Sequence, residues 1–199
     1  TAASTFSTVS LQSDATLDAS LLPTLAVTGN LSNAGGVVSL ARTDSTPTNT
    51  LAVTGNYTAN GGTLALNTVL NDAGTSTSDV LQADAVVAGG TPTLISIAPD
   101  AASHPALTTG DGILVVRVNG GVLASDANAF ALPGGYLDAG GVRYVLVRNA
   151  GNGNWYLQAT QLVPGPGTPV PTLHPLALLA LGMGLAACVG WRRKGVKQE

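Results

Sequence analysis

Apolar and polar residues alternate along much of the chain with a period of two, which is typical of β-strands. The pattern is clearest in residues 51–70, LAVTGNYTANGGTLALNTVL, where apolar side chains recur at alternate positions from Leu51 and again from Leu64. Between these runs lies an Asn-Gly-Gly turn at 60–62, and glycine tolerates the positive φ angles of a tight corner. The segment therefore predicts two strands joined by a sharp turn, as in a β-hairpin or in one coil of a β-solenoid.

The pattern also repeats, which favours the solenoid. The sequence LAVTGN occurs at 25–30 and again at 51–56, an offset of 26 residues, and a degenerate third copy starts near Val80. Self-similarity at a period of roughly 20 to 50 residues is typical of solenoids, whose coils share one continuous core. The copies are rich in Val, Leu, Thr and Gly and lack the runs of Glu and Lys that favour helices. We therefore expect an all-β parallel β-helix.

Equivalent positions of the copies carry the residues expected at the corners. Asn30 and Asn56 are equivalent, so in a solenoid they would stack and exchange side-chain amide hydrogen bonds as an Asn ladder. Both asparagines also begin N-x-[ST] motifs, but we prefer the ladder to glycosylation because Asn is common at corners. The expected glycine corners are Gly35, Gly36, Gly61, Gly62, Gly89 and Gly90.

Aromatic residues concentrate after position 130, where the composition changes. The alternating segment 142–148 and the segment NWYL at 154–157 flank a turn rich in Asn and Gly, which predicts an antiparallel hairpin. A solenoid needs such a cap, since an open terminal edge would template aggregation. The expected cap residues are Tyr136, Tyr144, Trp155, Tyr156 and Leu157.

The C-terminal residues have the layout of a membrane anchor. No charged residue lies between Leu173 and Trp191, and the basic run Arg192-Arg193-Lys194 follows at once. About 20 apolar residues span a bilayer, and basic residues favour the cytoplasmic side. We therefore expect a transmembrane helix with the body outside. The expected organisation is an N-terminal extension or partial coil (1–24), solenoid coils (25–129), the aromatic cap (130–162), a Pro/Gly linker (163–172) and the membrane segment with its basic tail (173–199).

Charge and chemistry point away from nucleic acids and from catalysis. Of the eight Lys and Arg residues, four lie in the last eight positions, so the body is acidic and no nucleic-acid partner is expected. His104 and His174 are the only histidines, and no carboxylates cluster with a basic residue as a polysaccharide lyase requires. A single cysteine, Cys188, excludes an intramolecular disulfide. We expect a monomer that is not an enzyme and that binds no cofactor or metal.

Several blocks in a fixed order resemble the C-terminal passenger region of pertactin-like autotransporters. The blocks are residues 51–70, Asp79-Val80-Leu81, the strand at 112–116 and the aromatic hairpin at 140–157. The resemblance implies a right-handed parallel β-helix. It also implies a capping segment that helps the passenger to fold as it emerges at the outer surface.

The C-terminal layout is similar to the IPTL-type sorting signals of Gram-negative bacteria, which are related in layout to PEP-type signals. This resemblance implies recognition by a membrane-embedded sorting peptidase, with inner-membrane anchoring before the tail is cut. The residues that carry it are Val170, Pro171, Thr172, Leu173, Trp191, Arg192, Arg193 and Lys194.

Together the patterns predict a non-enzymatic passenger fragment at the envelope or surface of a Gram-negative bacterium. Its role would be adhesion, display or scaffolding, with host or cell-surface ligands as partners. One alternative is the stabilising C-terminal part of a polysaccharide-active β-helix enzyme whose active site lies upstream. Another is a structural domain that stays tethered to the membrane.

Overall fold

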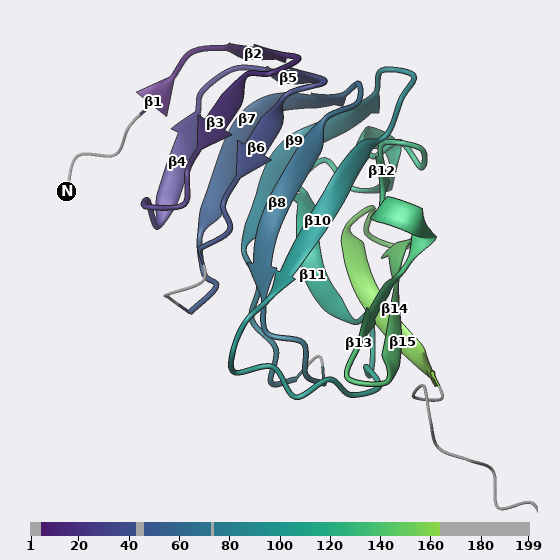
Figure 1. Ribbon diagram of the computed structural model, residues 1–199. Coiled ribbons are helices and arrows are strands. Elements are labelled where there is room, and N and C mark those ends of the chain that lie inside the picture. The colour runs from purple at the N-terminus through teal and green to yellow at the C-terminus, as the bar shows by residue number, and fades with distance from the viewer. Residues whose placement is uncertain (1–4, 43–45, 73, 164–199) are drawn as a thin grey trace, which may run out of the picture. The chain divides into compact units, whose positions relative to one another are not determined.

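The structure, a computed structural model, describes residues 5–42, 46–72 and 74–163 (Figure 1). The chain divides into two units, residues 1–163 and 164–199, and all of the described residues lie in the first. Its strands are β1 (Thr5–Phe6), β2 (Val9–Gln12), β3 (Thr16–Asp18), β4 (Thr24–Val27), β5 (Leu31–Ala34), β6 (Val37–Ser39), β7 (Thr50–Ala59), β8 (Thr63–Thr68), β9 (Val80–Ala88), β10 (Thr93–Pro99), β11 (Ile113–Val118), β12 (Phe130–Ala131), β13 (Leu137–Ala139), β14 (Val142–Arg148) and β15 (Trp155–Leu162). Two short 3-10 helices, η1 (Val122–Ala124) and η2 (Pro133–Gly135), complete the elements.

The strands form two sheets that wind as stacked coils, and this confirms the prediction of an all-β fold with parallel sheets. The first sheet has the order β1-β4-β7-β9-β11-β15-β14-β13, with β2 and β5 beside it, and the second has the order β12-β10-β8-β6-β3. From β1 to β11 all strand pairs are parallel, and each strand pairs with its equivalent in the next coil. Figure 1 shows the coils side by side, with the β13–β15 strands at one end.

The repeated LAVTGN segments lie directly beside each other. Leu25 pairs with Leu51 and Val27 with Val53, as the sequence predicts, and Leu51 pairs in turn with Leu81. These side chains are buried and belong to one continuous hydrophobic core. Like residues therefore stack in columns along the coils, which buries an apolar face that a single coil would expose.

The first coil begins earlier in the chain than the repeats indicate. Residues 5–18, within the segment that the sequence leaves as an extension or a partial coil, form β1, β2 and β3, and these pair in parallel with β4, β5 and β6. Phe6 pairs with Val27, and Leu17 with Val38. The sequence of this coil is degenerate, but its alternation of apolar residues still matches the register of its neighbour.

The glycine corners allow neighbouring coils to approach closely. Gly62 has a φ of 72°, a conformation that residues with a Cβ rarely adopt, and a Cβ there would overlap the carbonyl oxygen of Gly36 in the preceding coil. A Cβ on Gly89 would come within 2.6 Å of Asn60. The corner residues with positive φ are Gly35, Gly61, Gly62 and Gly90, whereas Gly36 and Gly89 are crowded by the preceding coil.

Candidate functional site

The end of the solenoid is closed by a change in strand direction at β11. On one side β11 pairs in parallel with β9, and on the other it pairs antiparallel with β15. A register shift interrupts the second ladder between Leu114 and Val116. Beyond it the side chain of Asn154 continues the ladder, since its Oδ1 accepts the backbone N–H of Val118 at 2.8 Å. The hairpin of β14 and β15 therefore satisfies the edge that a further parallel coil would otherwise need to cover.

Three aromatic rings link this hairpin to the coils. The ring of Phe130 meets that of Trp155 edge-on, with 5.3 Å between centroids, and lies 5.6 Å from the ring of Tyr57 at a tilt. Tyr57 belongs to β7, two coils before the cap, and all three side chains are buried. Such contacts stabilise beyond the area that they bury. The cap is thus packed into the core of the coils rather than placed against their outer surface.

The hydroxyl of Ser125 is the centre of a buried polar cluster under the hairpin. It donates to the carbonyl oxygen of Gly153 at 2.7 Å, and it accepts the indole N–H of Trp155 and the Nε–H of Arg148, each at 3.2 Å. Arg148 also donates to the carbonyl oxygen of Val122 at 2.6 Å. Because each buried polar group has a partner, the cluster fixes the position of Trp155 without an uncompensated desolvation cost.

Tyr144 attaches the cap to the long connection before β11. Its hydroxyl donates to the carbonyl oxygen of Ala106 and accepts the Ala106 N–H, both at 3.1 Å. Burial raises the pKa of the Tyr144 phenol, and burial likewise raises that of Tyr57. Tyr57 accepts a hydrogen bond from Nδ2 of Asn33 at 3.4 Å.

The other expected cap residues lie in two different environments. Leu157 and Tyr156 are buried, and the Tyr156 hydroxyl accepts hydrogen bonds from the side chains of Asn152 and Asn154. Tyr136, by contrast, follows η2 and is 45% exposed. The guanidinium of Arg143 lies 3.7 Å from the centre of its ring and also pairs with Asp138, where the hydrogen bond lowers the pKa of the carboxyl. Tyr136 therefore belongs to the surface of the cap.

Residues that the sequence does not single out as cap residues carry much of the cap's polar geometry, and of these only Ser125 lies outside the expected range 130–162. No sequence pattern identifies Ser125, Arg148 and Asn154 in advance, because serine, arginine and asparagine are common in loops and at strand ends. Tyr57 offers one indication, since it occupies the repeat position at which the first copy has Leu31, and the two residues pair in the structure. An aromatic residue in place of an aliphatic one marks the coil that reaches the cap.

Asn30 and Asn56 lie on neighbouring coils, joined by a hydrogen bond. The Oδ1 of Asn30 accepts the backbone N–H of Asn56 at 2.9 Å. This contact joins a side chain to the backbone, where the expected ladder would join two side-chain amides. It lies at the break between the β4–β7 ladder, which ends at Val27 and Val53, and the β5–β7 ladder, which begins at Leu31 and Tyr57.

A second polar cluster lies where the chain passes from one coil to the next. Asp79 is fully buried, and its carboxylate accepts the backbone N–H groups of Asn49 at 2.9 Å and of Asn67 at 2.8 Å. Burial raises the pKa of this carboxyl, and the two backbone donors act in the opposite direction. The carboxylate thereby joins the segments that lead into β7 and β9 to strand β8.

Within the described part of the chain, no group of three or more His, Cys, Asp or Glu residues is placed to hold a metal ion. His104 is exposed, and its backbone N–H donates to Asn71. In residues 5–42, 46–72 and 74–163 there is also no helix of the length and apolar character needed to cross a membrane. The expected membrane helix and sorting residues, Val170, Pro171, Thr172, Leu173, Trp191, Arg192, Arg193 and Lys194, lie outside the described residues, as does His174.

The fold and the closing hairpin together define a class of protein, a parallel β-solenoid whose last coil is sealed by an antiparallel cap. Residues 26–146 match the sequence profile of the family described as Autochaperone Domain Type 1. The match covers more than half of the chain, from β4 to β14, and the chain belongs to this family. A search of curated proteins finds no match.

Proposed function

We propose that residues 5–163 belong to a β-solenoid passenger that is exported to the surface of a Gram-negative bacterium, and that the cap at 130–162 promotes the folding of this passenger. The observation that carries the proposal is the double pairing of β11, parallel to β9 and antiparallel to β15. Membership of the autochaperone family supports it, because such domains accompany autotransporter passengers. The passenger itself serves adhesion, display or scaffolding and is not an enzyme.

The contacts of the cap explain how it would promote folding. β14 and β15 are joined by a short turn, in which the Asn149 N–H donates to Asn154 O at 2.8 Å, so this hairpin forms from local contacts. Local contacts form faster than pairings between distant segments. The completed hairpin presents one edge to β11, and β11 then presents an edge to β9. Each added coil gains its ladder and its apolar contacts from a coil that is already ordered.

Pulse-labelled hydrogen exchange during refolding of the full chain tests this order. The proposal expects backbone amides of β14 and β15 to become protected first, followed by those of β11, β9, β7 and β4. The Trp155→Ala variant should delay protection in β9 and β7, because the ring links the hairpin to the coils. Protection of β4 and β7 before the hairpin, or at an unchanged rate in the variant, would contradict a folding role for the cap.

We also propose that residues 170–194 direct sorting. The Val170-Pro171-Thr172-Leu173 motif, an uncharged stretch and a basic cluster are the supporting features, and a membrane-embedded peptidase would recognise them. Mass spectrometry of the protein from its native host is the test. A mature chain that lacks residues 191–199 agrees with processing, whereas a mature chain that keeps Lys197 favours a domain permanently tethered to the membrane.

A further inference from the structure

The outer edge of β10 is only partly covered. Its other edge pairs with β8 from Leu94 to Pro99, but on the outer side β12 pairs with Thr93 and Leu94 alone. In the same sheet, each earlier strand pairs along its whole length with the strand of the next coil: β3 with β6, β6 with β8, and β8 with β10. Among the strands of the described residues, β12 is thus the last of this sheet, and beyond its two residues β10 carries a stretch that is unpaired on this side.

The direction of the peptide groups shows which atoms this edge presents. The N–H of Leu94 donates to Gly62 and that of Asp100 donates to Thr68, both on the β8 side, whereas the N–H of Thr93 donates to Ala129 on the β12 side. Peptide groups alternate in direction along a strand, so Ile97 directs its N–H and its carbonyl oxygen to the outer side. No other strand of the described chain pairs with it there.

The chemistry of Pro133 explains why β12 is so short. In the register that pairs Leu94 with Ala131, the N–H of residue 133 would be the next donor to β10. Proline has no N–H, and it begins η2, which carries the chain away from the sheet. The ladder therefore ends two residues after it begins.

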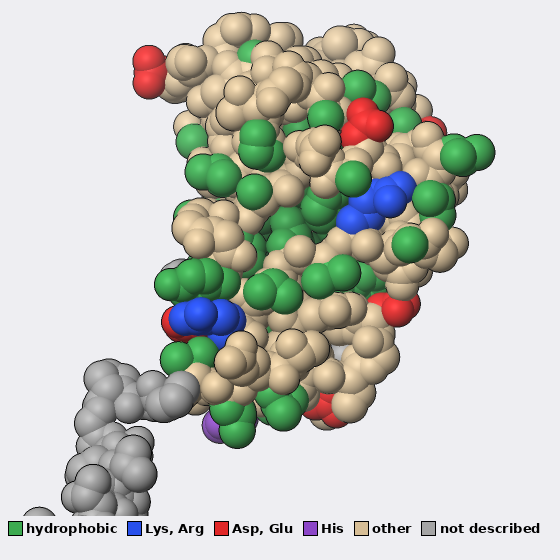
Figure 2. All heavy atoms as spheres, turned by 90° about the vertical axis from the view of Figure 1, so that its right-hand side faces the viewer, with side chains coloured by type: hydrophobic (Ala, Val, Ile, Leu, Met, Phe, Trp, Pro, Cys, Tyr) green, Lys and Arg blue, Asp and Glu red, His purple; other side chains and the backbone are tan. Residues whose placement is uncertain are grey.

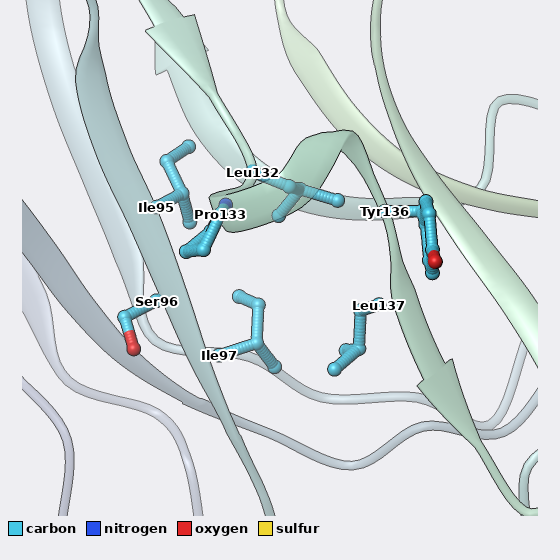
Figure 3. A pocket seen from close by; sticks show the side chains of 7 residues that line it. All are labelled: Ile95, Ser96, Ile97, Leu132, Pro133, Tyr136 and Leu137. Carbon is cyan, nitrogen blue, oxygen red and sulfur yellow. The ribbon is translucent and has the colours of Figure 1, made fainter.

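An apolar pocket of about 200 Å³ lies at the place that β12 vacates. Residues 95–97 of β10 line one side, and Leu132, Pro133 and Leu137 line the other, with Tyr136 beside them. Figure 3 shows Ile97 and Leu137 facing each other across the open space. Figure 2 shows that the face of the unit on which the cap lies is hollowed, with hydrophobic side chains on the floor of the hollow and a basic side chain at its rim.

We propose that the free edge of β10 and this pocket bind an extended, uncharged polypeptide strand, which pairs with Ile97 and inserts one apolar side chain between Ile97 and Leu137. The occupant is an unfolded segment of passenger-type sequence. The proposal rests on the proposed folding role, because it identifies the chain on which that role would act. Addition of a strand to an exposed edge is a common mode of peptide recognition, with backbone bonds giving affinity and pockets giving specificity.

Continuity with the existing sheet supports this occupant. A bound strand would extend the same ladder that β12 begins on β10 and would take the place that a further coil occupies elsewhere in the stack. The pocket has no charged lining residue, which favours neutral side chains. The strands of this sheet have the required character, since β8 is TLALNT and carries no charge.

A labelled peptide with the sequence of residues 61–70, GGTLALNTVL, is a direct probe with the full chain as receptor. Fluorescence anisotropy should show saturable binding, and hydrogen exchange should show slower exchange of the Ile97 amide in the bound state. Leu137→Glu places a charge in the pocket and should weaken binding by about tenfold or more. Leu94→Glu is the matched control on the same strand, since the Leu94 side chain lies on the face of the sheet that points away from the core and is 38% exposed.

A second peptide tests the proposal on the unmodified chain, so the test does not depend on whether the Leu137→Glu variant folds. The same peptide with Leu66→Asp should bind the unmodified chain at least about tenfold more weakly. The inference is overturned if no saturable binding occurs, if the Ile97 amide exchanges at its unbound rate, or if both substitutions leave affinity unchanged. Protection of Ile97 that depends on protein concentration without peptide would overturn it in favour of a second copy. The order of folding is measured without peptide, so either proposal can fail while the other stands.

Discussion

The phenol oxygen of Tyr144 lies 3.1 Å from both the backbone nitrogen and the backbone oxygen of Ala106. One side chain of the cap thus forms hydrogen bonds with both backbone polar groups of a residue in the irregular connection between β10 and β11. This connection has few backbone ladders of its own, and the tyrosine takes over the role that a neighbouring strand has elsewhere.

Tyr144→Phe should destabilise the protein by about 1 to 3 kcal/mol, because it leaves the two polar groups of Ala106 without their partner. Urea unfolding followed by circular dichroism measures the change. Tyr136→Phe is the control, since that ring is exposed and no hydrogen bond to its hydroxyl is present in the described structure. Equal midpoints for all three proteins would show that the Ala106 contact contributes nothing.

Trp155→Ala should cost about 3 to 5 kcal/mol, as is usual when a large buried aromatic side chain is truncated. The loss includes the contact with Phe130 and the hydrogen bond to Ser125. Leu162→Ala, on the same strand but 62% exposed, should change stability little. A variant at Trp155 that unfolds at the midpoint of the parent protein would argue against a cap integrated with the core.

Gly62→Ala should destabilise by at least about 1 kcal/mol, because the residue has positive φ and its new methyl group would overlap Gly36. Gly74→Ala is the matched control, since a Cβ at that position meets no other atom within 4 Å. Thermal unfolding of both variants decides the matter. If the two glycines tolerate alanine equally, the corners are wider than the structure has them.

Stability should fall at alkaline pH because two phenols titrate differently in the folded and unfolded states. The pKa values of Tyr57 and Tyr144 are raised above their usual value of 10.0, so the folded chain keeps these protons to higher pH than the unfolded chain. Their contribution is therefore fully present below pH 10 and is lost as the pH rises through the folded values. The double variant Tyr57→Phe with Tyr144→Phe should show a flatter decline in the urea midpoint between pH 9 and about pH 11. An identical decline in both proteins would assign the effect to other groups.

Much of the fold is predictable because the copies are similar. Leu25 and Leu51 begin identical segments, and identical segments that stack in register place like residues side by side. The glycine pair at 61–62 is equally visible, since a corner between two short strands needs residues that adopt positive φ. These features depend on local sequence and on the repeat alone.

The cap is less predictable because its contacts join residues that are far apart in sequence. Phe130 meets both Tyr57 and Trp155, and nothing near any of these residues specifies the other two. Ser125 becomes the partner of Trp155 only after the chain has passed through β12, η2, β13 and β14. Tyr136 shows the converse, because a cluster of aromatic residues in the sequence does not determine which ring faces inward. η2 turns this ring towards solvent, where it lies under Arg143.

The in-register stacking of coils that differ in length has a consequence for how such a chain can vary. Leu51 pairs with Leu81 although 30 residues separate them, whereas 26 separate Leu25 from Leu51, and the longer connection still brings residues 50–53 into register with residues 80–83. Segments inserted where one coil passes to the next would form loops on one side of the solenoid, away from its hydrophobic core. The entropic cost of a longer connection of this kind grows slowly with its length. A gene of this type can therefore diversify what it presents to its surroundings while its scaffold stays constant.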